Sequence, residues 1–146
     1  MDMMNASSVN PPIVVGVDGS ETGNEALRWA ARLGECMGCS LHAILVWEDV
    51  YASTPEVVLP PPVDWQALGE STLEESLTTV FGTERPAGLT TTVVAGHPSH
   101  RLVEASRDAT MLVVGSRGHG GFVGLLLGSV SGAVSAHAHC PVLVAR

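Results

Sequence analysis

Glycine and serine are concentrated in one stretch of the chain, residues 115–131, which reads GSRGHGGFVGLLLGSVS. This stretch follows an apolar run, Met111–Val114, and leads into a segment with helical spacing. Glycines let the backbone approach a ligand closely, and consecutive N–H groups can surround an anion. The N-terminus of the following helix adds unpaired amides and a favourable dipole, while Ser129 and Ser131 add hydroxyls. Together these features predict a phosphate-binding site.

The spacing of the glycines does not fit the two best-known nucleotide motifs. A Walker A loop requires a lysine, and the chain contains none. The pattern G-x-G-x-x-G fails because Val123 stands where the third glycine would fall. A G-x-x-G loop of the KH type can be drawn at Gly115–Gly118, but the charge of the chain argues against it. Glycine content alone is equally compatible with a surface loop of small residues.

The charge balance excludes several classes of function. Seven basic residues, all arginine, stand against 15 acidic ones, for a net charge of -8. Nucleic-acid binders normally need a basic face, so no nucleic-acid partner is expected. The absence of lysine also excludes Schiff-base chemistry. Backbone amides bind phosphate without net positive charge, so we expect Mg²⁺ (or Mn²⁺) to bind through the phosphates.

Two cysteine-containing clusters are weaker candidates for chemistry. Cys36 and Cys39 form a C-x-x-C pair, but Cys36 falls at a helix end, where the dipole disfavours a thiolate. His137, His139 and Cys140 span a helix end and a strand start, so their side chains should diverge. We therefore expect neither a redox site nor a protein-bound metal.

Three further histidines, His97, His100 and His119, are expected near the mouth of the site. No Ser–His–Asp pattern or pair of carboxylates accompanies them. We interpret them as polar loop residues and predict no catalytic residue.

The elements that position these residues follow from hydrophobic patterning. Continuous, valine-rich apolar runs are typical of strands buried on both faces of a parallel sheet. Helical spacing separates them, which predicts a single βαβαβαβαβ domain of the α/β class. The expected strands are Ile13–Val17, Leu41–Trp47, Thr91–Val94, Met111–Val114 and Val142–Ala145. The expected helices lie near residues 22–37, Trp65–Val80, Ser99–Arg107 and Ser129–Ala138.

The sequence also predicts the start of the first helix, the N-terminal tail and one long loop. Ser20 or Thr22 is expected to cap the first helix, and Thr22 and Glu25 have the spacing of a capping box. Residues 1–11 are predicted to be a disordered tail before a domain of residues 12–146. The proline-rich segment Glu48–Val63 is expected to form an exposed loop. With no long apolar run and an acidic start, we expect a cytoplasmic protein without membrane contact.

Five motifs, in order, resemble the universal stress protein family over the chain from Pro12 onward. The fit is to the bacterial branch that binds ATP. From the N-terminus onward, the motifs are Val-Gly-Val-Asp18-Gly-Ser20, Ala26-Leu27-x-Trp29-Ala30, Gly96-His-Pro98, Gly115-x2-Gly118-x9-Gly128-Ser129 and His139-Cys140-Pro141-Val142-Leu143-Val144.

The resemblance implies a doubly wound, Rossmann-like fold with five parallel strands in the order 3-2-1-4-5 and four helices. Ligands of such sheets bind where the strand order reverses, here between strands one and four. It further implies that Val17, Asp18 and Val46 lie on the adenine and ribose side. Asp18 contacts ribose, adenine or metal-bound water, unless it merely caps the first helix. The remaining implied ATP-binding residues, on the phosphate side, are Gly115, Gly118, Gly128, Ser129, Val130 and Ser131.

The function implied is that of an ATP-binding regulatory or stress-response switch. Slow ATP hydrolysis or phosphoryl transfer is one alternative, and an interaction module, with a vestigial pocket or binding cyclic AMP, is another. The resemblance also suggests a homodimer through the last strand, at Val142, Leu143 and Val144. A proline at Leu143 is expected to remove a donor from that interface.

Overall fold

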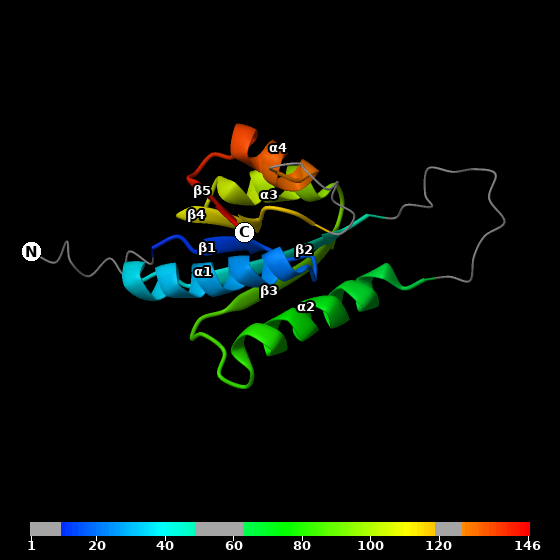
Figure 1. Cartoon of the computed structure of the whole chain (residues 1–146), viewed down its shortest axis with the longest axis horizontal. Helices are drawn as coiled ribbons and strands as arrows, with labels where there is room; N and C mark the ends of the chain where they lie inside the picture. Colours follow the sequence, from blue (N-terminus) through cyan, green and yellow to red (C-terminus); the bar gives the residue numbers. More distant parts are fainter. Residues whose placement is uncertain (1–9, 49–62, 119–126) are drawn as a thin grey trace, which may run out of the picture.

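The computed structural model describes residues 10–48, 63–118 and 127–146 of the chain. Strands and helices alternate along these residues, as the sequence predicts (Figure 1). The strands are β1 (Ile13–Gly16), β2 (Leu41–Trp47), β3 (Thr90–Ala95), β4 (Met111–Gly115) and β5 (Val142–Ala145). The helices are α1 (Glu21–Met37), α2 (Trp65–Phe81), α3 (Pro98–Ser106) and α4 (Ser129–His137).

The strands form one parallel sheet in the order β3-β2-β1-β4-β5, which confirms the expected topology. Central strand β1 pairs on both sides, so that Val15 lies opposite Ala43 of β2 and opposite Val113 of β4. Along the chain, β2 and then β3 are added on one side of β1, and β4 and then β5 are added on the other side. The strand order therefore reverses between β1 and β4.

Two helical layers cover the sheet. Helices α1 and α2 pack on one face, and α3 and α4 pack on the other (Figure 1). Alternate residues of β1 supply the two cores: Ile13 and Val15 belong to the α1 side, and Val14 belongs to the α3 side. Burial on both faces explains why the strands read as continuous apolar runs instead of alternating ones.

The start of α1 differs from one expectation. Ser20 is the N-cap, and its hydroxyl accepts a hydrogen bond from the amide of Gly23 at 3.1 Å. The capping box expected from Thr22 and Glu25 is wrong, because Thr22 lies inside the first turn. Its hydroxyl instead donates to the carbonyl of Arg117, a contact between residues 95 positions apart in sequence.

Two sequence expectations fall mainly on parts of the chain outside the described residues. These are the tail, as far as residue 9, and the long loop, from residue 49 to residue 62. Asn10, the first described residue, donates from its amide to the carbonyl of Met37 at 3.4 Å. None of the described helices has both the length and the apolar character needed to cross a membrane.

Candidate functional site

The carboxyl ends of β1 and β4 lie side by side, because the two strands pair in parallel register. Asp18 follows β1, and Ser116, Arg117 and Gly118 follow β4. These two turns therefore meet where the strand order reverses, which is the usual ligand site of an open α/β sheet.

Asp18 connects the two turns. Its Oδ1 atom accepts hydrogen bonds from the amide of Ser20, at 2.9 Å, and from the hydroxyl of Ser20. The other carboxylate oxygen, Oδ2, lies 2.7 Å from where a Cβ atom on Gly118 would be placed. Asp18 is thus not the cap of α1, since Ser20 has that role. It orients the capping residue and leaves its second oxygen facing the glycine turn.

Thr22 holds the turn after β4 in place. Its hydroxyl donates to the carbonyl of Arg117 at 2.5 Å, and its Oγ1 atom lies 3.3 Å from the donating amide of Arg117. A Cβ atom on Gly115 would lie 2.5 Å from that same Oγ1 and 2.8 Å from the backbone nitrogen of Gly23. Glycine is needed at position 115 because the first turn of α1 packs directly on the end of β4. Contact between Gly115 and a ligand stays a prediction.

Gly118 and Gly128 bring two backbone segments close together. The amide of Gly128 donates to the carbonyl of Ser116 at 2.6 Å, which places the start of α4 beside the turn after β4. Gly118 is exposed, and the one side chain that a Cβ there would meet is the carboxylate of Asp18. Neither glycine has a positive φ, so their use in this chain reflects space and not backbone conformation.

The first turn of α4 has uncapped backbone amides at the place where the sequence predicts anion-binding groups. Gly128 is the N-cap, and no side chain caps the helix. The amides of Ser129, Val130 and Ser131 have no acceptor within the helix, because the first turn of any helix lacks one. With the positive end of the helix dipole, they form a concentrated set of donors beside Gly118.

The two serines of this turn are not equivalent. Ser129 is exposed, so its hydroxyl is available to a ligand. Ser131 is buried, with 2% of its surface exposed, and its hydroxyl donates to the carbonyls of Ser116, at 3.0 Å, and Gly128, at 3.2 Å. In this arrangement its hydroxyl holds the turn and α4 together, so any contact of Ser131 with a ligand would come from its amide.

Val46 offers backbone groups at the other side of the site. In a parallel sheet the N–H and C=O of one residue point to one neighbouring strand, and those of the next residue to the other. The carbonyl of Ile44 accepts from Val17, and that of Trp47 accepts from Gly96 after β3, so Val46 points toward β1. Since β1 ends at Gly16, the Val46 groups face the space beyond it.

Val17 itself contributes little side chain to this space. It is buried in the core on the α1 side, with 4% exposed, and its amide donates to Ile44 at 2.9 Å. Any contact between Val17 and a ligand would therefore come from its backbone.

None of the described histidines and cysteines forms a hydrogen bond or ion pair with the turns after β1 and β4. His97 and His100 lie at the start of α3, after edge strand β3, with their ring centroids 4.7 Å apart and their ring planes tilted by 36°. Nδ1 of His97 lies 2.9 Å from the hydroxyl of Ser99. His119 is outside the described residues. Cys140 is partly buried next to β5, and this burial raises the pKa of its thiol.

Sequence reasoning missed the residues that position the site. Thr22 was considered only as a helix cap, and Ser116 was not singled out within the glycine stretch. Their hydrogen bonds join segments that lie 95 and 15 positions apart. No local pattern indicates such contacts, although a hydroxyl in the first turn of α1 could have prompted the question of what it binds.

The fold and these turns define a class: doubly wound α/β domains with a glycine turn and a helix start at the point where strand order reverses. A sequence model of the universal stress protein family matches residues 10–146. The chain belongs to this family.

Two relatives illustrate the match at the level of sequence. The universal stress proteins Rv2623 and Rv2005c of Mycobacterium tuberculosis are 37% and 38% identical to the chain over 138 residues. In each case the alignment covers 92% of this chain but 45% of the relative. The chain therefore spans less than half the length of these proteins.

Solved structures show the same fold at lower identity. A universal stress protein from Lactobacillus plantarum has a TM-score of 0.72 and 23% identity, covering 94% of this chain and 98% of its own. A universal stress protein in complex with cAMP has a TM-score of 0.68 and 24% identity, covering 95% and 98%. One from Archaeoglobus fulgidus, in complex with dAMP, has a TM-score of 0.65 and 22% identity, covering 94% and 99%.

Proposed function

We propose that the chain binds ATP between the ends of β1 and β4 and acts as a nucleotide-dependent regulatory switch in a stress response. The observation that carries the proposal is the convergence of Asp18, Gly118 and the open first turn of α4 in one place. Backbone amides with one carboxylate suit a nucleotide bound with a divalent cation, because the amides take the phosphates and the carboxylate takes ribose or metal-bound water.

The geometry supports a division of the site. The outward-facing N–H and C=O of Val46 form a donor–acceptor pair that matches the edge of an adenine base. Asp18 lies between this pair and the glycine turn, at the position for the ribose. Gly118, Gly128 and the amides of Ser129, Val130 and Ser131 then take the phosphates. Mg²⁺ or Mn²⁺ would neutralise the phosphate charge, with Asp18 as the carboxylate that faces the glycine turn.

Two structural relatives form complexes with adenine nucleotides, one with cAMP and the other with dAMP. These complexes support an adenine nucleotide as the ligand, and the number of phosphates on that ligand is left to be measured. We favour ATP because Gly115-x2-Gly118-x9-Gly128-Ser129 resembles the motif of the ATP-binding branch of the family.

Two measurements test this proposal. Mass spectrometry of small molecules released from the purified protein identifies a ligand that copurifies. Calorimetry with ATP, AMP and cyclic AMP, each with Mg²⁺, then ranks them. We expect ATP to bind more tightly than AMP, because the additional phosphates use the α4 turn. Equal affinities for the two would contradict the phosphate assignment, and tighter binding of cyclic AMP would favour the alternative ligand.

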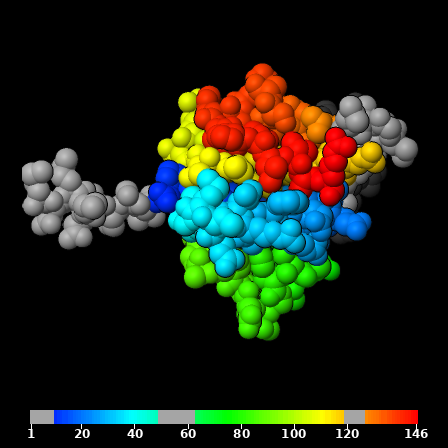
Figure 2. Space-filling model, turned by 60° about the vertical axis from the view of Figure 1, so that its left-hand side comes forward, coloured from blue at the N-terminus to red at the C-terminus, as the bar shows by residue number. Residues whose placement is uncertain are grey.

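We also propose a homodimer through β5. This strand is the edge of the sheet, pairing with β4 on one side only. Figure 2 shows the edge at the surface, between α1 and α4. Val142, Leu143 and Val144 are apolar and partly buried, and an uncharged free edge is prone to pair with another chain. Antiparallel pairing with the same strand of a second copy closes as a two-fold dimer.

The hydrogen bonds of β5 correct the substitution suggested by the sequence. The carbonyls of Pro141 and Ala145 accept from β4, so by alternation Leu143 also points to β4. Val142 and Val144 therefore carry the outward N–H groups. A proline at Leu143 would damage the sheet of the monomer instead of the free edge.

A further inference from the structure

The sheet has a second free edge at β3, which pairs with β2 on one side only. The sequence of β3, TTTVVA, contains no charged residue and no proline, which are the usual means of keeping an edge strand from pairing with another chain. One hydrogen bond shows which backbone groups lie on this edge. The amide of Gly96 donates to the carbonyl of Trp47 in β2 at 2.9 Å. By alternation, the outward N–H and C=O groups are those of Thr91, Val93 and Ala95.

Gln66, in the first turn of α2, binds one of these outward carbonyls. Its Nε2 atom donates to the carbonyl of Val93 at 3.0 Å and to Oε1 of Glu70 at 3.1 Å, which uses both hydrogens of the amide. Its Oε1 atom accepts a hydrogen bond from the indole Nε1 of Trp47 at 2.7 Å. Because an indole nitrogen can only donate, this bond fixes which end of the amide faces β3. The side chain is therefore held in place as a donor to the strand edge.

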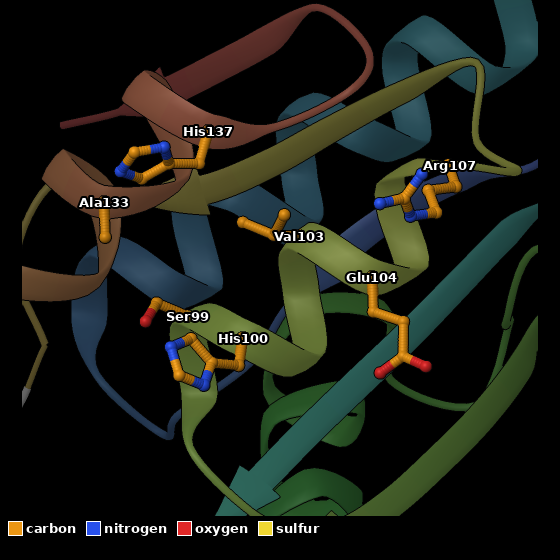
Figure 3. Close-up of a pocket in the computed structure, with 7 residues that line it drawn as sticks. All are labelled: Ser99, His100, Val103, Glu104, Arg107, Ala133 and His137. Carbon is orange, nitrogen blue, oxygen red and sulfur yellow. The ribbon is translucent and has the colours of Figure 1, made fainter.

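Arg101 of α3 binds the next outward carbonyl along β3. Its Nε atom donates to the carbonyl of Ala95 at 3.1 Å, and its Nη1 atom lies 3.8 Å from Oε2 of Glu104. Other residues of α3, among them His100 and Val103, line the pocket between α3 and α4, and Glu104 points away from α4 (Figure 3). Arg101 is not part of this pocket, and its side chain extends to the end of β3.

Gly96 leaves room for this arginine. Its φ of 144° is a conformation that glycine adopts more readily than other residues, and a Cβ atom there would lie 2.7 Å from Nε of Arg101. The motif Gly96-His-Pro98 therefore has a structural explanation that is independent of the candidate nucleotide site. It turns the chain from β3 into α3 and leaves space for a side chain of α3 to cross the strand end.

We propose that Gln66 and Arg101 close the β3 edge, so that no strand of another chain can pair with it. Such a strand must donate hydrogen bonds to the outward carbonyls of β3. The carbonyls of Val93 and Ala95 already accept hydrogen bonds from the two side chains, which would have to be displaced first.

The edge at β5 is different. Its outward groups are those of Val142 and Val144, and in the described part of the chain no side chain donates to either carbonyl. Two self-pairing edges on opposite sides of one sheet would let copies add without limit, whereas a single one gives a closed two-fold dimer. Closure of β3 thus limits the kind of assembly that the chain can form. This role goes beyond the proposed function and does not rest on the β5 dimer, because an opened β3 edge would also join two monomers.

The test opens the β3 edge with substitutions that keep side-chain length but remove the donors. Gln66→Met and Arg101→Met are combined, folding is checked by thermal melts, and the mass in solution is measured by light scattering at micromolar concentrations. We expect the double variant to reach at least about twice the mass of the wild type, because one additional self-pairing edge joins two assemblies. A folded double variant with the wild-type mass would overturn the proposal. A monomeric wild type would contradict the β5 dimer alone.

A control variant and a rescue variant place the new contact at β3. Arg107→Met makes the same change at another exposed arginine that follows α3 and should leave the mass unchanged. Ala95→Pro, added to the double variant, removes an outward N–H at an exposed position and should restore the wild-type mass. Aggregation that results from unfolding would persist in the proline variant. A larger mass that persists with Ala95→Pro, or an equal increase in Arg107→Met, would exclude the β3 edge.

The two side chains are also tested one at a time, in case the double variant fails to fold. Arg101 is exposed, so Arg101→Met leaves the core intact and still frees the carbonyl of Ala95. We expect its mass to rise with concentration more steeply than that of Arg107→Met. The same mass for the two arginine variants at every concentration would overturn the role of Arg101.

Discussion

The carboxylate of Asp18 lies between the ends of β1 and β4. Its Oδ2 atom is 2.7 Å from the point that a Cβ atom would occupy if one were added to Gly118. Its other oxygen is held by Ser20, the cap of α1. The start of α1 and the turn after β4 therefore form one structural unit. A ligand bound at Gly118 would contact both.

Replacement of Gly118 should remove nucleotide binding without unfolding the chain. In Gly118→Val the added atoms would displace the Asp18 carboxylate and fill the space assigned to phosphate, while the exposed position leaves the core intact. Isothermal calorimetry should detect no ATP binding, and the thermal melt should stay near wild type. Gly132→Ala is the control, because a Cβ there meets nothing within 4 Å. Undiminished binding by Gly118→Val would show that the site lies elsewhere.

Substitutions of Asp18 and Ser20 should affect different properties, the first the affinity for ATP and the second the stability of the fold. We expect Asp18→Ala to weaken ATP binding by about 1–3 kcal/mol through loss of charged hydrogen bonds. Ser20→Ala should instead lower the free energy of unfolding by about 0.5–2 kcal/mol, because it removes the helix cap. Calorimetry and urea unfolding of both variants give the comparison. An unchanged affinity of Asp18→Ala would leave Asp18 with a structural role only.

Two proline variants of β5 should behave differently. Val144→Pro removes an outward N–H from an edge strand, where proline is tolerated, and should yield a folded monomer. Leu143→Pro removes a hydrogen bond to β4 and should destabilise the fold. Light scattering at micromolar concentration and thermal melts distinguish the two results. A wild-type chain that is already monomeric would refute the dimer.

His42 should make stability depend on pH. Its Nε2 atom lies 2.8 Å from the hydroxyl of Thr92, and burial lowers its pKa from 6.5. The unfolded chain thus binds a proton more readily than the folded chain. The free energy of unfolding should decrease as pH falls from about 6.5 through the lowered pKa, by at most about 1.4 kcal/mol per pH unit. Urea titrations should show a smaller decrease in His42→Gln; the same decrease in both proteins would assign it to other groups.

Any ATP hydrolysis should be slow, far below the roughly 1–1,000 s⁻¹ typical of enzymes. Phosphoryl transfer needs positioned cations and an oriented nucleophile, and Arg117 is the only arginine or lysine in residues 115–131. Backbone amides bind the ground-state phosphates about as well as the transition state, which gives affinity without rate. Phosphate release with Mg²⁺ is followed over about a day, with Arg117→Ala alongside and Gly118→Val as the control for contaminants. Turnover near one per second, lost in Gly118→Val, would make the chain an enzyme.

Much of the fold could be predicted because its signals are local. Each valine-rich run became a strand within one or two residues of its expected bounds, since burial on both faces leaves an unbroken apolar pattern. The strand order came from the motifs shared with the family, and the sheet confirms it. The candidate site was predictable to the same extent, as a glycine turn and a helix start after β4.

The sequence by itself thus determined the class of fold, the alternation of elements and the backbone character of the candidate site. Only the tertiary structure decided that Ser131 uses its hydroxyl internally and that Thr22 holds the turn at Arg117. It also decided that the backbone groups of Val46 face the space beyond the end of β1 and that those of Val144 face outward from the sheet edge. The spacing of apolar residues in the sequence indicates which face of a helix or strand is buried. The direction of a hydrogen bond, and the space left for a Cβ atom, depend on register and distance between segments far apart along the chain.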